Sequence, residues 1–181
     1  QKIEMKDDIT KFELSKKDLT TGEELAGASL QVTDKSGKVI DKWVSGKTPH
    51  SITKLTVGET YTLTETLPAP GYVTAKAITF TAADTGSVQK IEMKDDITKI
   101  RIQKVDLTIK TETEEGEGLS GATLQVMDRE ETVLDEWVTD GKPHVMEKLV
   151  VGETYILREL SPAEGYVTAE PVSFTVEDTE D

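Results

Sequence analysis

The amino-acid sequence predicts an all-β protein built from two tandem β-sandwich domains of about seven strands each. The first observation behind this prediction is a hydrophobic period of two, as in TYTLTET from Thr60 to Thr66. Side chains two residues apart lie on the same face of a strand, so the pattern is typical of strands with one buried face. The second observation is that Gly, Asp, Ser and Pro residues separate these segments at short intervals. The third observation is an internal repeat. No window has the period of a long amphipathic helix.

The repeat is unusually close. The string QKIEMKDDITK occurs at Gln1–Lys11 and again, unchanged, at Gln89–Lys99. The segments that follow also match, among them VGETYTLTETLPAPGYVTA from Val57 and VGETYILRELSPAEGYVTA from Val151. The second copy carries extra residues around Lys110–Gly118. A repeat of this kind indicates tandem homologous domains.

The limits of the two copies define the expected domains. Domain 1 covers 11–97 and domain 2 covers 98–181, and residues 1–10 contain a strand that matches the end of domain 1. Domain 1 runs on into its last strand, VQKIEMKDD, whereas domain 2 stops at Asp181 without a counterpart. We therefore interpret Gln1–Asp8 as the last strand of a preceding, absent repeat and the chain as a piece of a longer array. Domain 2 is expected to lack its own last strand.

The composition excludes several classes of function. With 21 basic and 35 acidic residues the formal net charge is −14, which argues against nucleic acid as a partner because phosphate backbones repel an acidic protein. There is no cysteine, which excludes disulfide frameworks, Cys-based zinc sites and thiol nucleophiles. No apolar run reaches bilayer length, so we expect no membrane partner. Neither a phosphate-binding loop nor a metal-ligand cluster occurs, and we expect no cofactor and no metal.

Three charged residues of domain 1 fall on the inward phase of their strands. In each of the segments FELSK, YTLTE and IEMKD, every second residue lies on the face that points to the core. The first two residues of this face are apolar, and the third is charged: Lys16, Glu65 and Asp95, respectively. The adjacent Asp96, like Asp8 in the leading copy, falls on the opposite face of its strand, away from the core. Isolated buried charges are very costly, and such groups normally pair, become neutral or react.

Two explanations of these inward charges stay open. One is a buried salt-bridge cluster, or strand ends where the alternation simply stops at solvent. The other is covalent, because a desolvated Lys loses its proton more easily and a desolvated carboxyl gains one. Lys16 would then attack the carboxyl carbon of Asp95, while Glu65 hydrogen-bonds the carbonyl and moves protons. The product is an amide between the first and last strands, with one water lost.

The same residues stand within motifs that resemble a known family. Their order is LSKKD or IQKVD, then LAGASLQV or LSGATLQV, then TETLPAPGY or RELSPAEGY, then IEMKDD. This order is similar to the Cna B-type (SpaA-like, prealbumin-like) repeat domains of Gram-positive surface adhesins and pilins, over nearly the whole chain. The resemblance implies a β-sandwich with an autocatalytic isopeptide bond from Lys to Asp or Asn, promoted by the Glu. Carried over by position, the residues it implies are Lys16, Glu65 and Asp95, and then Lys104, Glu159 and Asp7.

Domain 2 departs from the family pattern, because Lys104 and Glu159 have no acyl-donor strand within it. Asp7 is a donor without a receiver, since domain 1 already has Asp95. We therefore expect head-to-tail association, in which Gln1–Asp8 of one chain adds to the open edge of domain 2 in another and Asp7 bonds to Lys104.

The expected function is a stalk or spacer module of an extracellular, cell-wall-attached surface protein, with neighbouring repeats as its partners. This location follows from the resemblance, since the chain contains no signal or anchor. The Glu acts once per site, so the protein is not expected to be an enzyme with turnover. The alternative is a ligand-binding adhesin module for a host matrix protein or a glycan. The low aromatic content, 5%, weighs against it.

The remaining candidates are weaker. His50 and His144 are interpreted as loop or turn residues rather than ligands, so a hydrolase lacks a His-centred site. Trp43 and Trp137 are interpreted as packing residues, with a sugar-stacking surface as the lesser alternative. The run Glu112–Glu117 is interpreted as a solvated loop.

Overall fold

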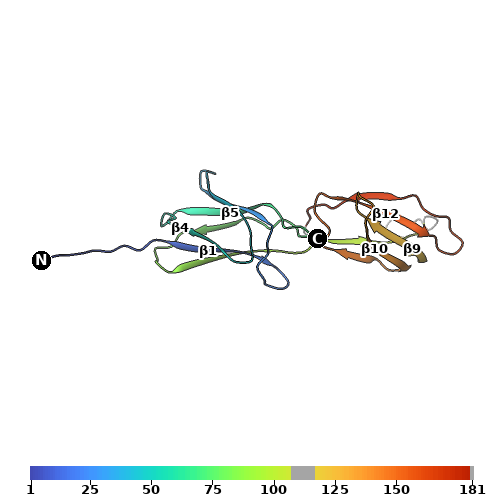
Figure 1. The fold of residues 1–181 in the computed structure, drawn as a ribbon, viewed down its shortest axis with the longest axis horizontal. Coiled ribbons are helices and arrows are strands. Elements are labelled where there is room, and N and C mark those ends of the chain that lie inside the picture. Colours follow the sequence, from blue (N-terminus) through green and yellow to red (C-terminus); the bar gives the residue numbers. More distant parts are fainter. Residues whose placement is uncertain (107–116, 180–181) are drawn as a thin grey trace. The chain divides into compact units, whose positions relative to one another are not determined.

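The structure is a computed structural model that describes residues 1–106 and 117–179. It divides into two compact units, which we call unit 1 (Gln1–Ile97) and unit 2 (Thr98–Asp178) (Figure 1). The described residues form thirteen strands and no helix, which confirms the predicted all-β fold. They accordingly include no helix that could span a bilayer.

The insertion that the sequence predicts around Lys110–Gly118 falls largely outside the described residues, as does the run Glu112–Glu117.

Unit 1 is a sandwich of two sheets. One sheet has the strand order β4-β1-β7 and the other has the order β3-β2-β5-β6. The strands are β1 (Lys11–Asp18), β2 (Ser29–Asp34), β3 (Val39–Val44), β4 (His50–Thr53), β5 (Thr60–Leu67), β6 (Ile78–Thr81) and β7 (Val88–Asp95). The DKSGK segment at Asp34–Lys38 forms a hairpin turn between β2 and β3, closed by a hydrogen bond from Asp34 N–H to Lys38 O of 3.0 Å.

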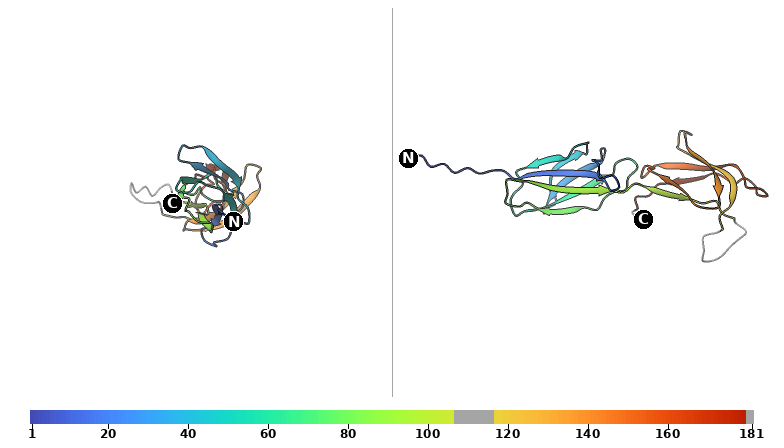
Figure 2. Two further views of the ribbon diagram at one scale, coloured as in Figure 1. Left: turned by 90° about the vertical axis from the view of Figure 1, so that its left-hand side faces the viewer. Right: turned by 90° about the horizontal axis from the view of Figure 1, so that it is seen from below.

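The first and last strands of unit 1 lie side by side and run parallel (Figure 2). Their register runs from Lys11 opposite Val88 to Asp18 opposite Asp95. Strand β4 covers the other edge of β1 in the antiparallel sense. Because β1 and β7 are parallel, the chain enters this pair at one end and leaves it at the other.

The core of unit 1 is built from the inward phase that the alternation predicts. Phe12 and Leu14 of β1, Leu63 of β5 and Met93 of β7 are each no more than 2% exposed. Complete burial of a side chain of this size contributes about 1.5–3 kcal/mol to folding. Strand β7 therefore supplies both a ladder partner and part of the core.

Unit 2 repeats this arrangement with six described strands. One sheet has the order β10-β9-β12-β13, and the other consists of β11 and β8. The strands are β8 (Lys99–Ile102), β9 (Ser120–Met127), β10 (Val133–Asp140), β11 (His144–Glu147), β12 (Thr154–Ser161) and β13 (Val172–Thr175). No described strand takes the place that β7 has in unit 1.

The absence of such a partner shortens the first strand of unit 2. Strand β8 has four residues where β1 has eight. It pairs along its length with β11, and no described strand pairs with its other edge. A strand continues only where a neighbour completes its hydrogen bonds. Lys104, which the alternation places on the strand, therefore lies two residues beyond its end at Ile102.

The leading segment Gln1–Asp8 also differs from the sequence prediction. The sequence predicts a strand there, but these residues are exposed and form no strand. They extend away from the sheets of unit 1 (Figure 1). The inward-phase residues of the repeat are in solvent, with Ile3 87% and Met5 93% exposed. A strand sequence without a ladder partner does not form a strand.

Candidate cross-linking site

Three charged side chains meet in the core of unit 1. Lys16 comes from β1 and Asp95 from β7, in one sheet, whereas Glu65 comes from β5 in the other. Lys16 and Asp95 are 1% exposed and Glu65 is 4% exposed. Lys16 Nζ lies 3.0 Å from Glu65 Oε1 and contacts Asp95 Oδ1. The structure thus brings together the three residues that the alternation singled out.

Strand register explains why Asp95, and not its neighbour, reaches Lys16. Lys16 pairs with Met93, and Asp95 lies two residues further along β7, so it shares the inward face. Asp96 is half-buried, and its Oδ1 accepts a hydrogen bond of 2.8 Å from Ile97 N–H. It therefore ends the strand and takes no part in the cluster.

The electrostatics of the cluster favour a neutral carboxyl. Burial raises the pKa of Asp95 to about 7; the contact with Lys16 opposes this rise and the adjacent Glu65 adds to it. Three ionised groups in a dry core would carry a large desolvation cost. A protonated Asp95 lowers that cost, and a protonated carboxyl is also the form that an amine can convert to an amide with loss of water.

The two carboxyl groups of the cluster are held differently. Glu65 Oε2 accepts a hydrogen bond of 2.7 Å from Ala75 N–H, which leaves Oε1 facing Lys16. Asp95 Oδ2 has no hydrogen-bond partner among the described residues. An unsatisfied buried oxygen is costly. Formation of an amide removes one oxygen from this carboxyl, so the arrangement fits a reaction better than a finished salt bridge.

Tyr72 is a residue of the site to which the sequence analysis assigned no role. Its hydroxyl donates a hydrogen bond of 2.8 Å to Asp18 Oδ2, at the end of β1. Burial and the Asp18 carboxylate raise the pKa of Tyr72 to about 12, so the hydroxyl stays a donor. Leu19 N–H donates to the backbone oxygen of Asp95 at 2.8 Å. Tyr72 and this backbone contact therefore fix the strand ends that carry Lys16 and Asp95.

A signal for this tyrosine was present in the repeat. Unit 2 has the same pair as Tyr166 and Asp106, with a distance of 2.7 Å between Tyr166 Oη and Asp106 Oδ2. Both members recur at matching positions, the Tyr after Pro-x-x-Gly and the Asp two residues after the Lys. Recurrence of a polar pair in both copies would have been sufficient to propose the contact.

Unit 2 contains two of the three groups. Lys104 Nζ lies 3.1 Å from Glu159 Oε1, and Glu159 Oε2 accepts a hydrogen bond of 2.5 Å from Ala169 N–H. The Glu159 side chain is 2% exposed, but the Lys104 side chain is 18% exposed, where that of Lys16 is 1%. Asp7, the third predicted residue, is exposed in the leading segment.

A hollow of about 300 Å³ lies beside Lys104 and Glu159. Its apolar walls come from Leu124, Leu157 and Val172. Leu157 is partly buried, whereas its counterpart Leu63 in unit 1 is 1% exposed. In unit 1, strand β7 with Met93 and Asp95 occupies the corresponding place.

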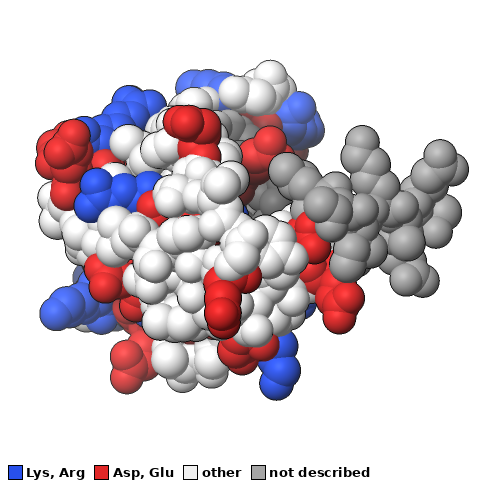
Figure 3. All heavy atoms as spheres, turned by 90° about the vertical axis from the view of Figure 1, so that its right-hand side faces the viewer, with Lys and Arg blue, Asp and Glu red and all other residues white. Residues whose placement is uncertain are grey.

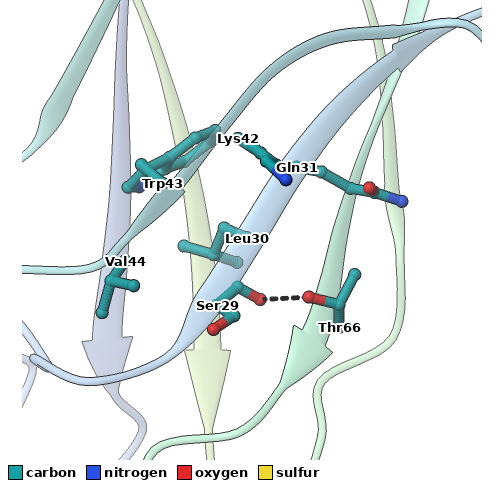
Figure 4. A pocket seen from close by; sticks show the side chains of 7 residues that line it. All are labelled: Ser29, Leu30, Gln31, Lys42, Trp43, Val44 and Thr66. Carbon is teal, nitrogen blue, oxygen red and sulfur yellow. Dashed lines mark hydrogen bonds between the residues drawn. The ribbon is translucent and has the colours of Figure 1, made fainter.

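A second hollow, in unit 1, bears on the adhesin alternative. It has a volume of about 420 Å³ and is lined by residues of β2, β3 and β5 (Figure 4). The Trp43 ring in its wall stacks on His50 at 4.1 Å, and His50 Nε2 lies 2.9 Å from Asp41 Oδ2. One ring face is therefore covered, which leaves less aromatic surface for a sugar.

The histidines were expected in loops or turns, and this expectation is wrong. His50 and His144 are the first residues of β4 and β11, where they pair with Leu14 and Ile102. The pairing places each ring against a tryptophan of its unit. Within the described residues, no group of three or more His, Asp or Glu side chains could hold a metal ion.

Comparisons with known proteins place this geometry in context. A family model described as SpaA, prealbumin-like fold domain, matches residues 10–97 and again 99–181. No curated protein matches the chain. Among solved structures, the Bacillus anthracis TIE protein has 21% identity and a TM-score of 0.58, with 95% of this chain and 32% of that chain covered.

Two pilins are also similar. The streptococcal ancillary pilin has 23% identity and a TM-score of 0.45, over 95% of this chain and 60% of that chain. The shaft pilin SpaA from Lactobacillus rhamnosus GG has 13% identity and a TM-score of 0.41, over 95% and 94%. The chain thus spans about a third of the Bacillus anthracis protein and 60% of the streptococcal one.

Proposed function

The chain belongs to the SpaA family of prealbumin-like fold domains, and from this premise we propose that it is a stalk module of a Gram-positive surface adhesin or pilin. Its place is outside the cell, attached to the cell wall, and its partners are neighbouring repeats of the same surface protein. The acidic composition suits a solvated spacer. Figure 3 shows a face on which acidic side chains lie among uncharged atoms rather than in one binding patch.

The proposed stabilising device is an amide between Lys16 and Asp95. The neutral amine of Lys16 attacks Cγ of the protonated Asp95 carboxyl. Glu65 takes a proton from the nitrogen through Oε1 and returns it to the departing hydroxyl, which leaves as water. The C–N bond forms, one C–O bond breaks, and no other reactant is needed. Glu65 acts once per site, so this is not turnover catalysis.

The observation that carries this proposal is the dry contact of the three groups. Lys16 and Asp95 are almost completely buried and touch, with Glu65 at 3.0 Å. Holding reacting groups in contact removes the entropic cost of their encounter. The same contact would suit a buried ion cluster, but burial raises the pKa of Asp95 and so favours the neutral carboxyl that an amine can convert to an amide.

Intact mass under denaturing conditions tests the proposal. We expect the monomer to be lighter than its sequence by one water, and a Lys16→Ala or Asp95→Ala variant to show the full mass. Lys17→Ala is the matched control, because this neighbouring amine pairs with Glu92 on the other face of the sheet and should leave the loss of water intact. An unsubstituted monomer of full mass would sink the proposed bond.

The raised pKa of Asp95 predicts a pH dependence for a chain in which the bond cannot form. In a Glu65→Gln variant, burial should still hold the pKa of Asp95 above 3.8, its value in the unfolded chain, although loss of the Glu65 carboxyl removes part of the rise. The folded state then binds more protons than the unfolded chain between 3.8 and the raised pKa. Its free energy of unfolding should therefore fall as pH rises through this window, by up to about 1.4 kcal/mol per pH unit.

Denaturant unfolding at several pH values measures this slope. The control is the double variant Glu65→Gln, Asp95→Ala, which lacks the titrating group and should lose the slope. Equal profiles for the two variants between pH 4 and 7 would contradict the assignment.

The proposed function extends to self-association. Within the described residues, unit 2 has the Lys and the Glu of the site and no strand in the place of β7. We include head-to-tail association through residues 1–8 in the proposed function of the module.

A further inference from the structure

We infer that the chain binds a second copy of itself sideways, with the basic edge strand β3 of unit 1 in one copy pairing with the acidic edge strand β10 of unit 2 in the other. The contact is non-covalent and separate from the proposed cross-link, since it requires neither an amide nor residues 1–8. In surface stalks, such a contact would join neighbouring stalks side by side.

Both strands are edges of four-stranded sheets. Strand β3 begins the order β3-β2-β5-β6, and β10 begins the order β10-β9-β12-β13. Within the part of the chain that the structure describes, no strand pairs with the outer side of either one. The backbone N–H and C=O groups along such an edge are a template for pairing with a strand of another chain.

The two edges carry opposite charge. Residues 34–49, which contain β3, hold four lysines and two aspartates, a net charge of +2. The matching residues 128–143, which contain β10, hold one arginine, one lysine and six acidic residues, a net charge of −4. A β3 edge and a β10 edge therefore attract each other, whereas two β3 edges or two β10 edges repel.

Lys42 and Glu136 lie at the middle of this difference. They occupy matching positions, where Lys42 pairs with Gln31 of β2 and Glu136 pairs with Gln125 of β9. Both side chains are exposed on the outer faces of their sheets, and Lys42 lines the hollow of about 420 Å³ there (Figure 4). Lys42 makes no ion pair with any described residue. Glu136 Oε2 accepts a hydrogen bond of 2.8 Å from Gln125 Nε2 and leaves Oε1 for a partner.

The register of the contact follows from these faces. In an antiparallel pair with a continuous outer face, Lys42 lies directly opposite Glu136. Val44 and Val138, which lie on the same faces, then stand on either side of the charge pair. They are 65% and 63% exposed in the single chain. Opposite charges and apolar side chains facing each other both stabilise antiparallel strands.

Bulges keep the contact short and make it dependent on charge. The register of β3 against β2 shifts at Ile40, and that of β10 against β9 shifts at Leu134. A bulge bends an edge and limits its regular ladder. The regular stretches that remain are Asp41–Val44 and Asp135–Val138. With so few ladder hydrogen bonds, charge decides which edges pair, and association should weaken as salt rises.

Analytical ultracentrifugation of the whole chain tests the inference. Every sample carries Asp7→Ala, which removes the acyl donor proposed for joining chains head to tail. The average mass should rise with protein concentration between about 1 µM and 1 mM, and the rise should be smaller in high salt. A chain that stays a monomer throughout this range at low salt would overturn the inference.

Charge reversal identifies the two edges. Lys42→Glu and Glu136→Lys should each weaken association about tenfold, because each replaces an attractive cross-strand pair with a repulsive one. The double variant Lys42→Glu, Glu136→Lys should recover most of the affinity, since it keeps the pair with its charges exchanged. Recovery would also show that neither substitution prevents folding. If the double variant binds no better than the single ones, these residues are not paired.

Glu136→Lys also separates this contact from general repulsion between acidic chains. The substitution changes the net charge from −14 to −12, so general repulsion alone would make association tighter. Glu147→Lys is the matched control, because Glu147 is exposed on β11 in the other sheet of unit 2. It makes the same change in net charge and should not weaken association. Equal strengthening by both substitutions would exclude the edge of β10 as the contact.

Intact mass, measured on the same samples, keeps the outcomes apart. A monomer that has lost one water contradicts the sideways contact and leaves the proposed cross-link of unit 1 intact. Chains that associate through residues 42 and 136 but have the full mass support the contact, whereas the proposed cross-link fails.

Discussion

Pulling on the two ends of unit 1 should not extend the chain between Lys16 and Asp95, whereas the Lys16→Ala variant should extend by about 270 Å. The two residues are 79 positions apart in the sequence, and an extended chain spans about 3.4 Å per residue. This is the largest effect that the proposed bond predicts, because it changes whether the unit unfolds under load at all.

The reason lies in the parallel pairing of β1 and β7. Tension enters at the start of β1 and leaves at the end of β7, so the load falls on the ladder between these two strands. Without the bond, the ladder shears and the rest of the unit follows. With the bond, the load passes from Lys16 directly to Asp95, and the intervening strands carry none of it.

Single-molecule force measurements on the whole chain test this prediction. Glu65→Gln should extend like Lys16→Ala, because it also prevents the bond while keeping both cross-link residues. Lys104→Ala is the matched control in unit 2 and should leave unit 1 inextensible. Full extension of unit 1 in unsubstituted protein would show that the load-bearing link is absent.

The fold could be predicted from the sequence because its signals are local. Alternation in segments such as TYTLTET assigned the strands, and the Gly, Asp, Ser and Pro residues between them and the identical repeat assigned their grouping. The inward charges were found by the same rule, since Lys16, Glu65 and Asp95 each continue an apolar phase. The fact that they touch depends on two different sheets and on a parallel register, neither of which alternation reveals.

The parts that differed from prediction all depend on pairing between strands. Gln1–Asp8 has a strand sequence and forms no strand, and β8 stops at Ile102, for the same reason: no described strand completes their ladders. His50 lies on a strand rather than in a loop because it pairs with Leu14. The hydrogen bond from Tyr72 to Asp18 joins residues 54 positions apart in the sequence. The pattern of a single sequence indicates which residues are buried and where turns lie, but it does not indicate which strand edges have a hydrogen-bonded partner strand.

Unit 2 should unfold well before unit 1 in a chain that lacks residues 1–8, and this is the second large effect. Closing a loop of 79 residues by the Lys16–Asp95 bond stabilises unit 1 by about 4.5 kcal/mol through the entropy of its unfolded chain. Among the described residues of unit 2, no carboxyl group takes the place of Asp95 beside Lys104 and Glu159. The first strand of unit 2 has four residues, and Leu157 is only partly buried beside the hollow. Two separate thermal transitions are expected, with the earlier one belonging to unit 2.

Hydrogen exchange assigns the two transitions. The amides of β8 should exchange at the earlier transition, and those of β1 should remain protected until the later one. A Lys16→Ala variant, which cannot form the bond, should bring the transition of unit 1 down towards that of unit 2. If the two transitions stay equally far apart in this variant, the bond is not what separates the two units.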